Sequence, residues 1–179
     1  KTKVQAVEKN FPTLKTVAAI EGPWSVEFDP KWGGPGQITF DKLDDWTARP
    51  EPGIKHYSGR ARYRKTFDAP QSAREPGRRV YLDLGTLHSL AEVRLNGRDI
   101  GILWCPPWKV EVTEMLKPTG NKLEIDITNV WANRIIGDAA LPEDKRLTWT
   151  SSTGGLSNLK PTHKPSPSGL RGPVKLRVE

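Results

Sequence analysis

A recurring alternation of apolar and polar residues constrains this chain more than any other feature. In one clear case Leu123, Ile125 and Ile127 alternate with polar neighbours. A period of two puts successive side chains on opposite faces of a strand, so each segment has one apolar and one polar face. Eight or nine segments of the chain show this pattern: 16–20, 24–28, 57–67, 80–84, 91–95, 100–104, 108–112, 123–128 and 174–178. Two sheets with their apolar faces together satisfy it, which predicts an all-β fold, an antiparallel β-sandwich of the jelly-roll type.

The residues between the segments favour turns over helices. The chain of 179 residues holds 16 Gly, 16 Pro and 7 Trp, and only Thr113 to Leu116 looks helical, with Thr113 as the candidate N-cap. Asn96-Gly97 joins two alternating segments and predicts a tight hairpin. We expect a lead-in or linker over 1–15 and a single sandwich domain over 16–179. That domain would carry long irregular loops at 29–54 and 133–169, a kind of loop that is usually functional or disordered.

Charge and hydropathy exclude some classes of partner. The net charge is +7, but the basic residues are spread along the chain, so we expect a solvated basic surface and no nucleic-acid partner. No apolar run approaches the roughly 20 residues of a membrane helix, so no membrane partner is expected. The first lysines are followed by no apolar block, which argues against a signal peptide. We suspect that the chain is part of a longer protein.

The sequence contains no recognisable catalytic constellation or cofactor motif. His56, His88 and His163 lie far apart, without metal-ligand spacing. A calcium ion held by loop carbonyls is left open. Cys105, between Trp104 and a proline, is interpreted as a buried structural thiol. There is neither a nucleophile elbow nor a phosphate loop, so no catalytic residue, cofactor or metal site is predicted.

Aromatic residues at loop edges are the strongest indication of a binding site. Flat aromatic rings stack on the apolar faces of sugars, whose hydroxyls bind Asn, Asp and Arg. The stretch TNVWANRIIGD supplies both kinds of side chain. Alternatively, Trp131 plugs the end of the sandwich and Arg134 pairs with Asp138 to pin the loop. For Trp24 and Trp108, which alternate with polar residues, core packing is the better interpretation. Six tryptophans at loop edges lie within three residues of Gly, Pro, Asn, Asp or Arg: Trp32, Trp46, Trp104, Trp108, Trp131 and Trp149.

The order of motifs resembles a known family. GPWSVEFDP, YSGRARYRKTF, VYLDLGTLHSLAEVRLNGRDIGILWCPPWKVEVTEML and NKLEIDITNVWANRIIGD follow one another in the chain. Together they resemble the sugar-binding-like sandwich of glycoside hydrolase family 2. WANRIIGD and the later PSGLRGPV are similar to the C-terminal sandwich of family 106 α-L-rhamnosidase-like proteins. The resemblance covers roughly 22–178.

The resemblance implies a galactose-binding-domain-like jelly roll that acts as a non-catalytic accessory domain. Its partner would be the catalytic barrel of the same parent chain, which it braces, with carbohydrate as a second contact. The parent would be an α-L-rhamnosidase-like or β-galactosidase-like enzyme, secreted or periplasmic. The residues at the matching strand end, together with one exposed-looking tryptophan, become candidates for contact with sugar or barrel: Asn129, Trp131, Asn133, Arg134, Asp138 and Trp104.

A binding module that stands alone is the alternative. Arg60, Arg62 and Arg64 share one strand face and, with Arg78 and Arg79, could form a basic stripe for a protein or polyanion. Such a stripe predicts steep salt dependence of binding. A bracing domain should instead expose an apolar patch, and a lectin-like domain a shallow groove with one or two exposed tryptophans. A self-contained enzyme ranks last.

Overall fold

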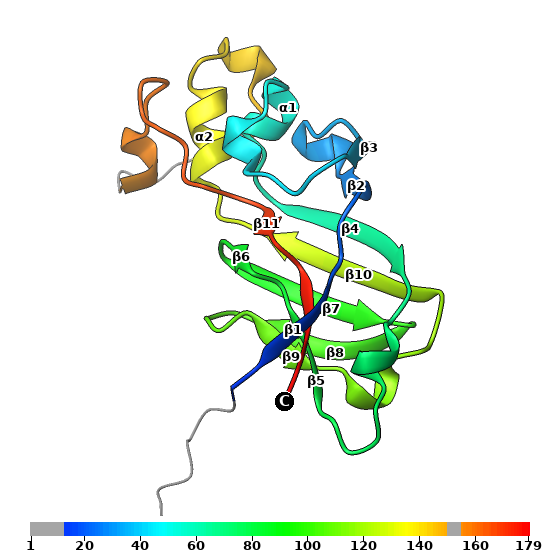
Figure 1. Cartoon of the computed structure of the whole chain (residues 1–179). Helices are drawn as coiled ribbons and strands as arrows, with labels where there is room; N and C mark the ends of the chain where they lie inside the picture. Colours follow the sequence, from blue (N-terminus) through cyan, green and yellow to red (C-terminus); the bar gives the residue numbers. More distant parts are fainter. Residues whose placement is uncertain (1–12, 150–154) are drawn as a thin grey trace, which may run out of the picture.

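Two antiparallel sheets hold the alternating segments and pack against each other (Figure 1). The computed structural model describes residues 13–149 and 155–179, without the side chain of residue 157. In this part of the chain the larger sheet has the order β3-β2-β4-β10-β7-β8, the smaller sheet β1-β12-β5-β9, and a third pair is β11-β6. All of these pairs are antiparallel, so the predicted all-β sandwich is confirmed.

Nine strands overlap the predicted segments, whereas β3, β6 and β11 were not predicted. Their bounds are β1 (Lys15–Ala19), β2 (Trp24–Phe28), β3 (Gln37–Phe40), β4 (Arg60–Phe67), β5 (Val80–Asp83), β6 (Thr86–Leu87), β7 (Leu90–Leu95), β8 (Arg98–Leu103), β9 (Lys109–Glu111), β10 (Asn121–Thr128), β11 (Leu170–Gly172) and β12 (Lys175–Val178). The expected lead-in over 1–15 lies largely outside the described residues, and β1 already begins at Lys15.

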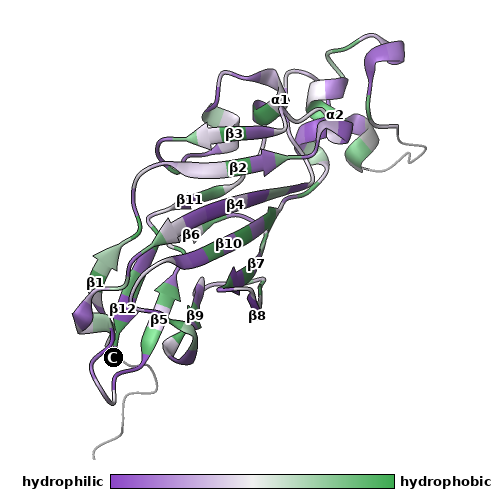
Figure 2. Ribbon diagram, turned by 90° about the vertical axis from the view of Figure 1, so that its right-hand side faces the viewer, coloured by the Kyte–Doolittle hydropathy of each residue, from purple (hydrophilic) through white to green (hydrophobic). Residues whose placement is uncertain are grey.

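The core lies between the two sheets and is built from the apolar positions of each strand. At the centre of the larger sheet Ile125 pairs with Tyr63 on β4 and with Val93 on β7, and all three are buried. Figure 2 shows the alternation of apolar and polar residues along β4 and β10. Trp24 is buried and Trp108 packs partly buried against the core, as predicted. Removing this apolar surface from water is the main force that holds the sheets together.

Both long loops contain regular structure that the sequence analysis did not predict. The first, 29–54, holds β3, the 3-10 turns Pro30–Trp32 and Trp46–Ala48, and helix α1 (Pro52–Lys55). The second, 133–169, holds most of helix α2 (Ala132–Asp138), and 3-10 turns at Glu143–Lys145 and Gly155–Asn158. These elements are too short for a periodic pattern to appear. In Figure 1, α1 and α2 lie side by side at the end of the sandwich opposite the C-terminus.

The single predicted helical turn is present, but its cap is not the predicted one. A 3-10 turn covers Thr113–Met115, and the residue at its N-cap is Val112. Thr113 instead accepts a hydrogen bond from the Val80 amide through Oγ1, at 2.9 Å, and so ties the turn to β5. The interpretation of Thr113 as the N-cap was wrong because its hydroxyl has this distant partner.

Asn96-Gly97 forms the predicted hairpin between β7 and β8. Both residues have positive φ, 55° and 79°, as a tight turn of this class requires. The Asn96 side chain also donates to the Met115 carbonyl at 2.7 Å and accepts from the Lys122 amide at 3.0 Å. The turn therefore fixes the neighbouring segment before β10 as well as its own strands.

The outer face of the larger sheet carries a cluster of ion pairs around Asp126. This carboxylate is fully buried and accepts from Arg62 at 2.7 and 2.9 Å and from Arg94 at 3.2 Å, while Arg60 lies 3.6 Å away. Burial alone would raise the pKa of Asp126, but the hydrogen bonds from Arg62 and Arg94 and the charge of Arg60 hold it below its ordinary value. The ionised carboxylate therefore stabilises the folded sheet.

Replacing Asn96 should cost stability in two separable steps. Asn96→Gly keeps the positive φ but removes the side-chain hydrogen bonds, and we expect the free energy of unfolding to fall by about 1–2 kcal/mol. Asn96→Ala adds backbone strain and should lose about 1 kcal/mol more. Urea unfolding of both variants, with Arg98→Ala on exposed β8 as the control, measures this. A glycine variant as stable as the unmodified chain would show that the hydrogen bonds contribute nothing.

Asp126→Asn should destabilise the chain at neutral pH and flatten its acid dependence. Breaking a fully buried ion pair costs about 3 kcal/mol or more, and we expect a smaller loss here because the guanidinium groups of Arg62 and Arg94 are partly exposed. Because the folded pKa is depressed, this stabilisation is complete above the ordinary aspartate pKa and is lost as the pH falls through the folded value. The difference in unfolding free energy between the two proteins should therefore shrink below about pH 4. The exposed Asp144→Asn serves as control, and a difference that is constant with pH would contradict the assignment.

Candidate functional site

A buried polar cluster fixes α2 to the end of the sandwich. Asn129, just after β10, donates to the Tyr57 carbonyl at 2.9 Å and to Ser168 Oγ at 3.0 Å. Asn133 on α2 donates to the same Ser168 oxygen at 2.9 Å and exchanges two 2.8 Å hydrogen bonds with the backbone of Ser166. Both asparagines and Ser168 are buried. The cluster therefore joins three segments that are distant in sequence: the end of β10, α2 and the residues before β11.

Arg134 and Asp138 continue this anchoring along α2. Arg134 Nε lies 3.1 Å from Asp138 Oδ1, one turn further on, and both side chains are buried. Asp138 Oδ2 also accepts from the Leu147 amide at 3.0 Å and from the Thr148 amide and hydroxyl at 2.7 Å each. The interpretation that this pair pins the loop is confirmed. Four of the predicted contact residues, Asn129, Asn133, Arg134 and Asp138, thus lie buried inside the domain, although the ion pair between Arg134 Nε and Asp138 Oδ1 is not aligned as a hydrogen bond.

Trp131 does not plug the sandwich, because its side chain remains 43% exposed. Its ring packs edge-to-face against Trp32, with centroids 4.9 Å apart and an interplanar angle of 70°. The plug at this end is Trp46, which is fully buried, contacts the rings of Phe28 and Tyr57, and donates from Nε1 to the Tyr63 hydroxyl. We name Trp32 and Trp131 the Trp pair.

Two hollows adjoin the Trp pair, and both rings line each of them. The first, of about 350 Å³, is apolar and is otherwise lined mainly by Ile135, Leu147, Trp149 and Leu156. We call it the apolar hollow. The second, of about 340 Å³, is polar, and we call it the polar groove. Besides the Trp pair it is lined by Glu27, Phe28, Asp29, Pro30, Tyr57, Gly59, Arg60 and Arg62.

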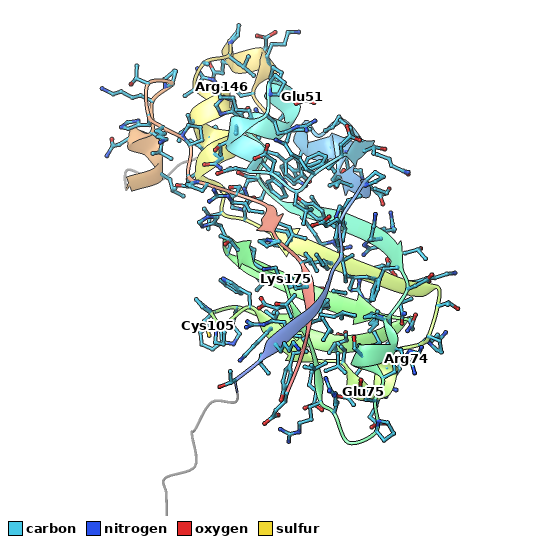
Figure 3. All side chains as sticks on the ribbon, in the orientation of Figure 1. Glu51, Arg74, Glu75, Cys105, Arg146 and Lys175 are labelled. Atoms are coloured by element: carbon cyan, nitrogen blue, oxygen red, sulfur yellow. The ribbon has the colours of Figure 1, made fainter. Side chains whose placement is uncertain are left out.

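Trp104, the remaining predicted contact residue, lies elsewhere. It is 74% exposed in the connection between β8 and β9, whereas the other five predicted contact residues lie in α2 or just before it. Cys105 beside it is exposed, so its interpretation as a buried thiol was wrong. Figure 3 shows Cys105 on the β-sheet body, well away from Glu51 and Arg146 near the helices.

The predicted basic stripe is not a free cationic surface. Arg62 is held by Asp126, Arg64 lies 2.7 Å from Glu27, and the remaining candidates also have acidic neighbours. Arg78 pairs with Glu75 at 2.7 Å, and Arg79 lies 3.5 Å from Glu179. Arg79 also immediately precedes β5 of the smaller sheet, so the five residues do not share a face. On β4, the carboxylates that contradict the stripe are Asp126 and Glu27 on the neighbouring strands. The sequence of β4 alone could not reveal them.

Sequence reasoning missed Asp29 and the position of Trp32. Asp29 caps the turn Pro30–Trp32 by accepting from the Lys31 amide at 2.9 Å, and Gly33 ends it with a φ of 75°. Asp-Pro followed by Gly is a recognised start and stop pattern. This local signal could have placed Trp32 on a fixed turn. Only the tertiary fold could show that Trp131 meets it.

The described residues contain neither a metal-binding cluster nor a membrane-spanning helix. In that part of the chain no three His, Cys, Asp or Glu side chains are grouped closely enough to hold a metal ion. Among the same residues, no helix has the length and apolar character needed to cross a bilayer.

Comparisons with known proteins agree with the resemblance noted from the motifs. The family model described as "Glycosyl hydrolase 2 galactose-binding domain-like" matches residues 54–157. A Formosa agariphila protein named "Putative beta-glucuronidase" is 42% identical over 135 residues, which are 74% of this chain and 12% of that protein.

Solved structures show the same relationship. A rhamnosidase from Novosphingobium sp. PP1Y matches with a TM-score of 0.86 and 32% identity, over 99% of this chain and 16% of its own. An uncultured Clostridium sp. beta-glucuronidase shares the fold, with a TM-score of 0.52 and 19% identity over 71% of this chain and 24% of its own. The chain thus spans less than a quarter of the length of each of these relatives. Because the family model matches more than half of the chain, the chain belongs to the glycosyl hydrolase 2 galactose-binding domain-like family.

Proposed function

We propose that this chain is a non-catalytic accessory domain of a larger glycoside hydrolase and that it braces the catalytic domain of the same polypeptide. The observation that carries the proposal is the apolar hollow with its rim. Trp149 is 85% exposed there, and Leu147 and Leu156 are exposed beside the Trp pair. Exposed apolar surface of this kind is typical of a face that another protein surface or a ligand covers.

The catalytic domain is the occupant that the comparisons favour. The relatives named above are several times longer than this chain, so a covering domain is available within one polypeptide. Intramolecular docking also needs little affinity, because a linked domain is present at high effective concentration. The anchoring of α2 fits this role, since a bracing surface must hold its shape.

Three described carboxyl groups are unsuited to act as the general acid of a glycoside hydrolase. Glycoside hydrolysis uses two carboxyl groups, one of which serves as acid with a raised pKa. The described carboxyls with a shifted pKa are Asp45, Glu51 and Asp126, and all three shifts are downward. Their hydrogen bonds hold the ionised form, which is the opposite of what a general acid requires.

The isolated chain should therefore not hydrolyse glycosides. Incubation with nitrophenyl α-L-rhamnoside, β-D-glucuronide and β-D-galactoside should release nitrophenol no faster than buffer does. The intact parent enzyme serves as the positive control under the same conditions. Turnover by the purified 179-residue chain that survives repurification would refute the accessory role.

A substitution of Trp149 should affect the parent enzyme, where the docking face is covered, but not the isolated chain. In the parent enzyme Trp149→Ser should lower the melting temperature, because a buried tryptophan contributes roughly 2–3 kcal/mol. In the isolated chain, where Trp149 is exposed, the same change should leave the melting temperature nearly unaltered. Trp104→Ser is the matched control, an exposed tryptophan away from α2. Equal effects of Trp149→Ser in the parent and in the isolated chain would contradict docking at this face.

A further inference from the structure

We propose that His56 and α2 form a pH-sensitive latch, which holds α2 in place while the imidazole is neutral and loosens it when the ring takes up a proton. The latch depends only on contacts within this domain. Its consequence for the parent enzyme rests on the proposed function, because α2 supplies Ile135 to the apolar hollow that forms the docking face. Asp138 on α2 also holds the backbone of Leu147 and Thr148, which line the same hollow.

The backbone of α2 packs directly on His56, at the place where α1 and α2 lie side by side (Figure 1). A Cβ atom on Gly137 would lie 2.6 Å from Cβ and 2.9 Å from Cγ of His56, so a side chain at 137 would not fit without displacing one of them. His56 ends α1, and the fully buried Ile54 anchors that helix to the core. Because α1 is fixed in this way, a repulsion that arises at His56 acts on α2.

Buried polar atoms with incomplete hydrogen bonding meet at this contact. His56 Nδ1, Arg134 Nε and Asp138 Oδ1 are buried and have no hydrogen-bond partner among the described residues. The Arg134 guanidinium lies at the same glycine, since its Nη2 is 3.0 Å from the position of a Cβ on Gly137. Asp138 is the ion-pair partner of Arg134, at 3.1 Å. A proton on His56 would therefore add a second cation where one buried carboxylate already serves the first.

The surroundings of His56 disfavour its protonated form. Burial lowers the pKa of His56 below its ordinary value of 6.5, and the positive charges of Lys55 on α1 and Arg134 on α2 lower it further. The backbone of Asn133 acts in the opposite direction through a hydrogen bond to the ring. The packed arrangement of the two helices thus favours the neutral imidazole.

The pH range of the latch differs from that of the Asp126 cluster. Because the pKa of His56 is depressed in the folded chain, the stabilisation is complete above the ordinary histidine pKa and is lost as the pH falls through the folded value. The Asp126 contribution changes only below about pH 4. Arg49 and Glu51, the charged groups just before α1, pair with each other at 2.7 Å. Acidification toward about pH 5 should therefore act on α2 and leave the sheets intact.

Amide hydrogen exchange of the isolated 179-residue chain at about pH 7.5 and about pH 5 tests the latch. After correction for the intrinsic pH dependence of exchange, the opening equilibrium of residues 133–138 should rise about threefold or more at the lower pH, with β4 and β10 unchanged. His56→Gln cannot take up a proton and should remove this rise. His88→Gln, in the connection between β6 and β7, is the matched control and should keep it.

Two further measurements keep the test independent of how well His56→Gln folds. The imidazole signals of the unmodified chain should show that His56 titrates below its ordinary pKa. Gly137→Ala places a methyl group against the ring, so it should open residues 133–138 already at neutral pH and respond little to acidification.

The latch would be overturned by exchange over 133–138 that does not depend on pH, by the same rise in His56→Gln, or by a rise spread equally over the strands. In the parent enzyme, the protection of residues 131–149 that docking predicts should be weaker at about pH 5 than at neutral pH. A latch that titrates in the isolated chain, with no protection of 131–149 in the parent at either pH, would contradict docking and support the latch alone.

Discussion

The α2 end of this domain depends on the hydrogen bonds that converge on Ser168. Its hydroxyl accepts from Asn129 and Asn133 and donates to the Ser166 carbonyl at 3.0 Å, all in a buried setting. Buried polar groups are costly when unpaired, so each member of this cluster holds the others in place. The apolar sandwich would form without them, but α2 would have no defined position on it, and Trp131 would have no fixed partner in Trp32.

The sandwich and its α2 end are built differently. Apolar side chains fill the core between the sheets, and the outer face of the larger sheet carries the ion pairs around Asp126. At the α2 end, short helices and turns present two tryptophans between an apolar hollow and a polar groove. A rigid base with a specialised rim is how loops on a stable scaffold usually acquire function. This chain matches only a small part of much longer relatives, and such a rim suits contact with a neighbouring domain.

Prediction from the sequence succeeded where a long periodic pattern carried the information. The sheets and the Asn96-Gly97 hairpin followed from alternation and turn chemistry, and the predicted pairing of Arg134 with Asp138 is present. It failed for α2 and β3, which span too few residues to show a period, and for the exposed Cys105. Of its two interpretations of Trp131, the plug was wrong and Trp46 fills that place, because both tryptophans lie in similar polar surroundings along the chain. Which aromatic turns inward, and which arginine meets a carboxylate, is decided by contacts across strands and loops.

Amide hydrogen exchange tests most directly whether the catalytic domain covers the α2 end in the parent enzyme. The exchange of the isolated 179-residue chain would be measured beside that of the same residues within the parent enzyme. Docking on the catalytic domain predicts slower exchange in the parent over 30–34 and 131–149, with β7 and β8 unchanged. Equal exchange over both segments in the two proteins, or protection confined to the opposite end of the sandwich, would contradict the account.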